Sequence, residues 1–369
     1  MPTSAADLGL DIATVDQRLA DGLNLPSHCY VDQAVFDFEM HAIFDRSWMY
    51  FAPRERLLQP GSVLTGQVGR VPVIVTRSDS GELRGFVNVC RHRGFTLVPE
   101  DTQCSRIQCG YHSWTYGLDG ALLRTPRADD IGAPKEDTGL HPVSVEEWGQ
   151  GVYVNTDPQA LPMHQAHPQL GEMVAGTGLS MGIDGFRWVG RHVHTQAANW
   201  KLWYDNGTEC YHCPTVHRTS FGSAYDVQDG SYESRYWGSM FSGRFEAVGT
   251  AESTDVVGGG YRAVQLFPCN QYIQQDNFVV LGRAVPIGPA STTFIVDYFS
   301  EADTAPETVD AWVKLWNQTY DEDARVVEEI QTNMASGRVE SMRYTPGLED
   351  PSRFMHGLIW QAYRAALAD

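Results

Sequence analysis

The 369-residue sequence predicts an α+β fold with two domains, a small antiparallel β domain followed by a larger domain in which helices pack on a sheet. The chain is 42% apolar and long enough to bury two cores. Its first half contains short runs of strand-forming residues between turn residues, and its second half contains longer runs together with helical patterns. The sequence has no internal repeat and no low-complexity segment.

In the first half, residues 1–38 are predicted to form an irregular N-terminal lead-in, because Leu25-Pro26 would interrupt a helix. Apolar residues from Val35 to Trp48 then follow the period of a short amphipathic helix. Gly and Asp-Ser-Gly turns separate the strands that follow, as in a small antiparallel domain. These strands are expected at Val63–Val68, Val71–Arg77, Leu83–Val89, Arg106–Gln108, Leu122–Thr125 and Gly151–Asn155.

The second half follows a connector at Pro158–Pro168 that contains proline and histidine. We expect its longer strands at Phe186–Ala197, Tyr232–Ala247, Tyr261–Phe267, Gln271–Leu281 and Thr292–Phe299. We also expect three helices. The first begins at Trp200, the second runs from about Glu307 to about Ser336, and the third runs from about Ser352 to Leu367.

The formal net charge of −19 excludes two kinds of partner, because nucleic acids and anionic membranes repel an acidic surface. No apolar run approaches the roughly 20 residues of a membrane-spanning helix, and Met1–Leu10 does not resemble an export signal. We therefore expect a soluble, cytoplasmic enzyme. Seven cysteines are an odd number in such a chain, which favours ligation or burial over a disulfide scaffold.

The stretch Asn199–His217 gathers two carboxylates, two imidazoles and two thiols. Its first residue is a good helix N-cap, and Pro214 would end the helix. Within this helix Asp205, Glu209 and His212 fall at i, i+4 and i+7 and share one face, whereas the second histidine lies beyond the proline. Such a density of donors predicts a metal site, which could hold zinc or iron.

A second pattern of donors lies in the first half. Cys90-Arg91-His92 and Cys109-Gly110-Tyr111-His112 form Cys-x-His and Cys-x-x-His with sixteen residues between them. Zinc sites more often place two cysteines on one loop, whereas here each loop offers one thiolate and one imidazole. This division suits a [2Fe-2S] cluster in which two Cys hold one iron and two His hold the other. The alternatives are a zinc site or ordinary loop residues.

With these motifs, Asn88–Gly94, Cys109–Trp114 and Asn199–His217 resemble the terminal oxygenase subunit of Rieske non-haem iron oxygenases. The resemblance extends from about Leu25 to Tyr363. It implies a Rieske [2Fe-2S] domain at 39–158 and a catalytic mononuclear iron domain at 159–369. The catalytic domain would have an antiparallel sheet packed by helices, of the helix-grip type, and residues 1–38 would pack on it.

The resemblance assigns the cluster to four ligands, Cys90, His92, Cys109 and His112. In respiratory-chain Rieske proteins a disulfide also ties the two loops, but neither loop here carries the extra cysteine. Cys104 lies between the loops without a matching partner, and we interpret it as structural. We therefore expect the lower-potential type of cluster that oxygenases use.

Non-haem Fe(II) oxygenases hold their iron with two His and one carboxylate, which leaves positions free for O₂ and substrate. His212 and His217 match the two histidines of the family, and Glu209 matches the acidic residue three positions before the first. In the family this acid is not a ligand but bridges the iron to a cluster histidine of the neighbouring subunit. The resemblance thus implies an electron route between subunits and a homotrimer.

Asp323 is predicted to be the third ligand for two reasons. It lies on the apolar stripe of the long helix, where a carboxylate is costly unless paired or metal-bound, whereas Asp321 and Glu322 point off the stripe and can be solvated. It also occupies the family's ligand position, eight residues before Gln331. A shifted helix that turns Asp321 inward is the alternative. The stripe comprises Val309, Val313, Trp316, Tyr320, Val327, Ile330 and Met334.

The remaining donors of the stretch receive lesser roles. Asp205 is predicted to have at most a supporting role beside the iron. Cys210 and Cys213 point away from the predicted face of Glu209 and His212, and thiolates there would occupy the positions that O₂ needs. We interpret both cysteines as packing residues.

The predicted activity is that of a terminal oxygenase, which hydroxylates or oxidatively dealkylates a small organic substrate with O₂. Electrons would come from a separate NAD(P)H-dependent flavin or iron–sulfur reductase, since nothing in the chain resembles a nicotinamide or flavin site. The Glu209–His217 segment and Leu266-Phe267-Pro268 resemble the branch that acts on choline, glycine betaine and carnitine. Gly207-Thr208 departs from that branch, and an aromatic ring or an arylamine is the alternative substrate.

Two other classes of function remain at this point. A Rieske electron carrier without oxygenase activity would need little beyond residues 39–158, and the further two hundred residues argue against it. A binding module with a zinc ion would remain if the iron ligands were wrong.

Overall fold

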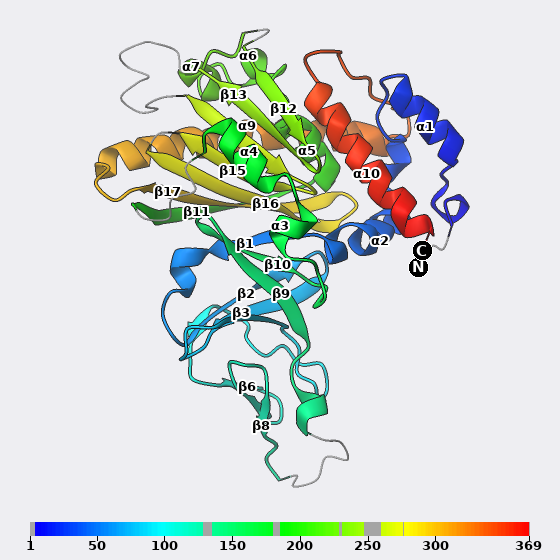
Figure 1. Cartoon of the computed structure of the whole chain (residues 1–369). Coiled ribbons are helices and arrows are strands. Elements are labelled where there is room, and N and C mark those ends of the chain that lie inside the picture. The colour runs from blue at the N-terminus through cyan, green and yellow to red at the C-terminus, as the bar shows by residue number, and fades with distance from the viewer. Residues whose placement is uncertain are drawn as a thin grey trace. The chain divides into compact units, whose positions relative to one another are not determined.

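The computed structural model describes residues 4–127, 135–179, 185–228, 231–246, 260–275 and 277–368. The chain forms two compact units, Asp45–Ala166 and Met1–Phe44 with His167–Asp369. Both contain antiparallel sheets, and the second also contains most of the helices, which confirms the α+β prediction (Figure 1). Within these ranges, no helix is long and apolar enough to cross a membrane.

The unit Asp45–Ala166 contains a seven-stranded antiparallel sheet in the order β1-β10-β9-β4-β3-β2-β5 and a three-stranded sheet β6-β7-β8. The predicted strands are present within two residues of their expected ends, and β1, β5, β7 and β9 were missed. The elements are β1 Met49–Pro53, β2 Ser62–Val68, β3 Val71–Arg77, β4 Leu83–Val87, β5 Thr102–Gln103, β6 Ile107–Gln108, β7 Thr115–Tyr116, β8 Leu122–Arg124, β9 Pro142–Trp148, β10 Gly151–Asn155 and α3 Met163–Ala166.

The second unit contains one seven-stranded antiparallel sheet in the order β11-β17-β16-β15-β14-β13-β12. Its strands are β11 Phe186–Gln196, β12 Glu233–Trp237, β13 Met240–Phe245, β14 Tyr261–Leu266, β15 Asn270–Gln275, β16 Phe278–Gly288 and β17 Ser291–Glu301. Its helices are α1 Ile12–Ala20, α2 Gln33–Ala42, α4 Leu170–Thr177, α5 Trp200–Gly207, α6 Cys213–Val216, α7 Phe221–Ala224, α9 Pro306–Ala335 and α10 Asp350–Ala368.

Two segments of this unit that were each predicted as one strand contain two strands in the structure. The segment Tyr232–Ala247 contains the hairpin of β12 and β13, whose turn passes through Gly238 at a φ of 57°, a conformation that favours glycine. Ala247 itself lies outside the described residues. The segment Gln271–Leu281 likewise spans β15 and β16, which reverse direction after Gln275.

The lead-in is also not irregular throughout. It contains α1, which is capped by Asp11, whose carboxylate accepts a hydrogen bond from the Thr14 amide at 2.8 Å. Leu25-Pro26 lies beyond the end of this helix and therefore does not interrupt it. The helix predicted over Val35–Trp48 is present as α2, but it ends earlier than predicted.

The long helix α9 packs on the sheet through a row of aromatic side chains, the arrangement expected of a helix-grip fold. The Trp312 ring stacks on Phe278 of β16 with centroids 4.2 Å apart, and Tyr320 meets Phe294 of β17 edge-on at 5.2 Å. Gln275 of β15 accepts hydrogen bonds from the indoles of Trp312 and Trp316. These contacts fix which face of α9 turns inward.

A buried ion pair joins the N-terminal segment to the rest of this unit. The Lys201 ammonium at the start of α5 lies 2.5 Å from Glu39 Oε1 of α2, and neither side chain is exposed. The carboxylate also accepts hydrogen bonds from the Trp200 indole, at 2.8 Å, and from the Tyr363 hydroxyl of α10. Because the Glu39 carboxylate has a cation and two hydrogen-bond donors as partners, its charge can be buried without being left unpaired.

Removal of one partner should therefore destabilise the protein. We expect Lys201→Met to lower the free energy of unfolding by about 3–5 kcal/mol, since the Glu39 carboxylate would stay buried without a cation. Denaturant titration measures this loss. The matched control is Arg364→Ala, which breaks an exposed pair with Asp16 and should cost less than about 1 kcal/mol. Equal losses in the two variants would contradict this account.

Candidate metal centres

The helix α5 begins where the sequence predicts and ends earlier. Asn199 caps it, and its side-chain oxygen accepts a hydrogen bond from the Lys201 amide at 3.0 Å. Its last residue is Gly207, a poor helix former. Beyond it, the Thr208 hydroxyl pairs with Ser352 Oγ of α10 at 2.9 Å. This contact ties the end of α5 to the C-terminal helix.

The predicted helical face for Asp205, Glu209 and His212 is consequently wrong, because Glu209 and His212 lie in a non-helical turn after α5. Pro214 does not end a helix either. It stands in the first turn of α6, where proline is tolerated because the amide has no helical partner. His217 follows directly as the C-cap of α6.

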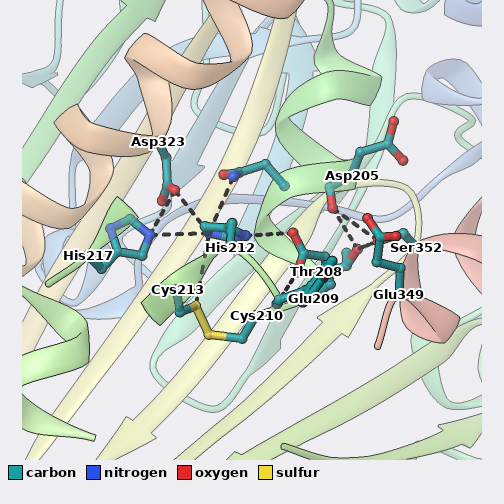
Figure 2. Close-up of polar contacts among 12 residues, drawn as sticks. Asp205, Thr208, Glu209, Cys210, His212, Cys213, His217, Asp323, Glu349 and Ser352 are labelled. Carbon is teal, nitrogen blue, oxygen red and sulfur yellow. Dashed lines mark hydrogen bonds and ion pairs between the residues drawn. A yellow bond between two sulfur atoms is a disulfide. The ribbon is translucent and has the colours of Figure 1, made fainter. Parts of the chain in front are cut away.

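The prediction for the two cysteines is also wrong. Cys210 and Cys213 form a disulfide across this turn, with Cα atoms 4.9 Å apart (Figure 2). Cys213 Sγ lies 4.0 Å from His212 Nε2. A sulfur in a disulfide is not the thiolate that metals bind, so this pair closes the turn around His212 instead of adding a ligand.

Three donor atoms converge at the end of this turn. His212 Nε2 lies 3.2 Å from His217 Nε2, and Asp323 Oδ1 of α9 lies 3.4 Å from the first nitrogen and 3.0 Å from the second (Figure 2). Neighbouring ligands of an octahedral ion with bonds of about 2.1 Å are ~3.0 Å apart. The three atoms therefore have the spacing of ligands on one face of a metal.

Each imidazole is oriented by a carboxylate at its other nitrogen. Glu209 Oε1 lies 2.5 Å from His212 Nδ1, and Glu322 Oε2 lies 2.8 Å from His217 Nδ1. Ser220 and Gln318 in turn donate hydrogen bonds to Glu322. Such partners keep the proton on Nδ1 and leave Nε2 free to bind a metal.

The role of Glu322 was missed in the sequence, where it was predicted to be solvated. Asp321 does point outward, with an exposed fraction of 60% for its side chain. Glu322 lies 105 residues after His217 in the chain. Its position next to Asp323 is the only signal in the sequence that could have indicated this contact.

The ionisable groups of this centre shift each other's pKa values. Burial would raise the pKa of the Asp323 carboxyl, but the imidazoles of His212 and His217 lower it to about 2. Burial would also lower the pKa of His212, but Asp323 and Glu209 raise it to about 10. Asp323 is thus a carboxylate at neutral pH, and a bound cation would replace the proton on His212.

The hydrogen bonding of Asp323 also indicates that this centre can hold a metal. Asp323 Oδ1 is buried, and among the described residues it has no hydrogen-bond partner of acceptable geometry. A buried carboxylate oxygen in this state is costly unless a cation lies beside it. The donor set of two imidazoles and one carboxylate is the one that non-haem Fe(II) sites use.

Asp205 is not brought to this centre. Its Oδ1 lies 2.5 Å from His356 Nε2 of α10, and its Oδ2 accepts a hydrogen bond from the Tyr30 hydroxyl at 3.3 Å. Figure 2 shows its carboxylate directed away from His212 and His217. Asp205 therefore joins α5 to α10 and the N-terminal segment.

A cavity opens beside the three donors. Two carboxylates, those of Glu209 and Asp323, face it together with His212 and His217. Most of the remaining wall is aromatic. Its aromatic residues are Trp203, Phe221, Tyr232, Phe245, Tyr261, Trp316 and Tyr320. A concave, largely aromatic wall with a few convergent polar groups is typical of a small-molecule site.

In the unit Asp45–Ala166, the two predicted loops bring together the four residues predicted to hold the cluster. Cys90 and Cys109 are buried, each with 2% exposure, whereas His92 and His112 are exposed, with ring centroids 4.7 Å apart. The structure thus places two thiols inside and two imidazoles outside. This separation fits a cluster whose two irons have different ligands.

The two loops have the same backbone design. The Cys90 amide donates to the Phe95 carbonyl and the Cys109 amide to the Trp114 carbonyl, both at 2.8 Å. The Tyr116 hydroxyl lies 3.4 Å from Cys90 Sγ. Cys104 packs against the same core at intermediate exposure, in agreement with a structural role.

The comparisons with known families agree with these two centres. Residues 47–137 match the Rieske [2Fe-2S] domain, and residues 183–365 match the catalytic domain of the ring hydroxylating alpha subunit. These matches define a terminal oxygenase with a [2Fe-2S] cluster and a mononuclear iron. The chain belongs to the Rieske non-haem iron oxygenases as an alpha subunit, which confirms the resemblance noted in the sequence.

The similar proteins share almost the full length of the chain. The carnitine monooxygenase oxygenase subunit of Acinetobacter pittii (strain PHEA-2) is 28% identical, over 91% of this chain and 92% of its own. The glycine betaine monooxygenase oxygenase subunit of Chromohalobacter salexigens is 29% identical, over 94% and 87%. The crystal structure of the quaternary ammonium Rieske monooxygenase CntA with L-carnitine superposes with a TM-score of 0.81 at 25% identity, over 94% and 97%.

Separate substitution of Asp321 and Asp323 on α9 should distinguish the iron ligand from its neighbour. We expect Asp323→Ala to lose the mononuclear iron and keep about two irons per chain, with the visible spectrum of the cluster unchanged. Asp321→Asn should keep both centres. Iron analysis together with absorption spectroscopy measures this. If Asp323→Ala retained the third iron and Asp321→Asn lost it, the ligand would be Asp321.

Loss of the carboxylate behind His217 should weaken iron binding without abolishing it. We expect Glu322→Gln to lower the affinity for Fe(II) about 10- to 100-fold, because the imidazole loses its charged partner. Competition with a coloured Fe(II) chelator measures the affinity. Glu329→Gln on the exposed side of α9 is the control. An unchanged affinity in Glu322→Gln would show that Glu322 does not orient the ligand.

Proposed function

We propose that His212, His217 and Asp323 hold the mononuclear iron and that Cys90, His92, Cys109 and His112 hold the Rieske cluster. When bound, the two centres supply one electron each for the reduction of O₂. The overall reaction joins a substrate C–H bond, O₂, two electrons and two protons to give a C–OH group and water. The observation that carries this proposal is the convergence of three donor atoms on the wall of an aromatic cavity.

Glu209 is proposed to connect the two kinds of centre. Its Oε1 holds His212 Nδ1 at 2.5 Å, so the carboxylate stands directly behind a proposed iron ligand. We propose that it also contacts a cluster histidine of the neighbouring subunit in a homotrimer, as in the family. Electrons would enter each cluster from a separate NAD(P)H-dependent reductase. The cytoplasmic location stays a prediction from the sequence.

We further propose that the substrate is a small quaternary ammonium compound. Seven aromatic side chains and two carboxylates surround the cavity, and electron-rich ring faces together with negative charge favour a cation. The names of the relatives point the same way. Hydroxylation of a carbon beside the nitrogen would give a product that splits into an amine and a carbonyl compound. An aromatic substrate remains the second candidate, since the same rings would stack on it.

The proposed bridge can be tested in a single turnover. With both iron centres loaded in excess Fe(II), we expect Glu209→Gln to slow oxidation of the reduced cluster at least about 100-fold in the presence of substrate and O₂, because the charged link behind His212 is lost. Stopped-flow absorption follows the cluster. Asp205→Asn is the control and should transfer electrons normally, since its carboxylate faces His356. Normal cluster oxidation in Glu209→Gln would refute the bridge.

The proposed cation preference can be tested with a pair of isosteres. Choline and 3,3-dimethylbutan-1-ol have the same shape and differ in charge. With a matched reductase, we expect the cation to have a kcat/KM about 5- to 30-fold higher, the range that cation–π contacts provide. Trp316→Leu should reduce this ratio. Product analysis measures the turnover. Equal values, or turnover of arylamines and aromatic acids alone, would favour the aromatic candidate.

A further inference from the structure

A second group of metal-binding side chains lies outside the aromatic cavity. His192 and His194 stand two residues apart on β11, so their side chains share one face of the strand. Asp321 of α9 approaches the same face. Its Oδ1 lies 4.0 Å from His192 Nε2 and 3.5 Å from His194 Nδ1. All three ligand atoms lie within 4.8 Å of one another.

These distances do not suit direct hydrogen bonds. A contact of 4.0 Å is too long for one, and a contact of 3.5 Å is at the limit. Ligands of a tetrahedral ion with bonds of 2.0–2.1 Å are about 3.3–3.5 Å apart, so small side-chain adjustments would place an ion between them. His192 Nε2 is also buried and has no hydrogen-bond partner among the described residues. A bound cation would satisfy this nitrogen.

We propose that His192, His194 and Asp321 form a second metal site, which takes Zn²⁺ or a similar divalent transition metal. Two imidazoles and one carboxylate are donors that zinc accepts, with a water in the fourth position. The side chain of Asp321 is 60% exposed, so the ion can enter from solvent. The net charge of −19 attracts cations to the protein.

This site would clamp α9 to the edge strand β11. Asp321 precedes Glu322 and Asp323 on the same helix, so the clamp would hold the helix that carries the proposed iron ligand. The donor set also accepts Fe(II), but such sites bind zinc more tightly than Fe(II). The same preference applies to the iron centre, so only zinc that is taken up without loss of iron can be assigned to the surface site.

The test uses the full enzyme with both iron centres loaded. Zn²⁺ is titrated in, the protein is desalted, and zinc and iron are measured by mass spectrometry. We expect about one zinc per chain with no loss of iron. In His192→Ala/His194→Ala and in the milder Asp321→Asn, the zinc affinity should fall at least about tenfold. The control is His164→Ala, which removes an exposed histidine elsewhere and should change nothing.

Two results would overturn the proposal. One is equal zinc binding by the wild type and by His192→Ala/His194→Ala. The other is zinc uptake matched by iron loss, which would place the zinc in the iron centre. Retention of the mononuclear iron shows whether the substituted unit of each variant is folded. Anomalous diffraction at the zinc edge should then place the ion about 2.0–2.2 Å from His192 Nε2 and His194 Nδ1.

Discussion

The catalytic unit depends on the buried carboxylate of Asp323. It lies on the inward face of α9 beside the aromatic cavity, where an unpaired charge would be severely destabilising. His212 and His217 approach it through Nε2, and each is held from behind by a carboxylate. Three acidic groups around two imidazoles leave excess negative charge at the centre. A divalent cation at the point of convergence resolves this imbalance.

The path of the chain follows from this constraint. A continuous helix from Trp200 would carry His212 along one face and past the cavity. Instead α5 stops at Gly207, a disulfide closes the next turn, and Pro214 opens a new short helix. The chain therefore reverses around His212 and returns with His217. The aromatic row on α9 fixes the third donor from the opposite side.

The sequence predicts the parts of this arrangement that depend on local pattern. The cluster loops are recognisable because each pairs a thiol with an imidazole at fixed spacing, and the inward direction of Asp323 follows from helical periodicity. The end of α5 and the contact of Glu322 with His217 were not predictable in this way. Both depend on contacts far apart in sequence, such as that of Thr208 with Ser352. The hairpin of β12 and β13 was predicted as one strand because only a short turn through Gly238 separates its two strands.

The central claim is that one iron lies between His212 Nε2, His217 Nε2 and Asp323 Oδ1. Anomalous diffraction at the iron edge, from crystals of the iron-loaded enzyme, tests it most directly. The account predicts a single peak about 2.0–2.2 Å from each of the three atoms, in addition to the peak of the cluster. No peak at this position, or an iron bound through Cys213, would contradict it.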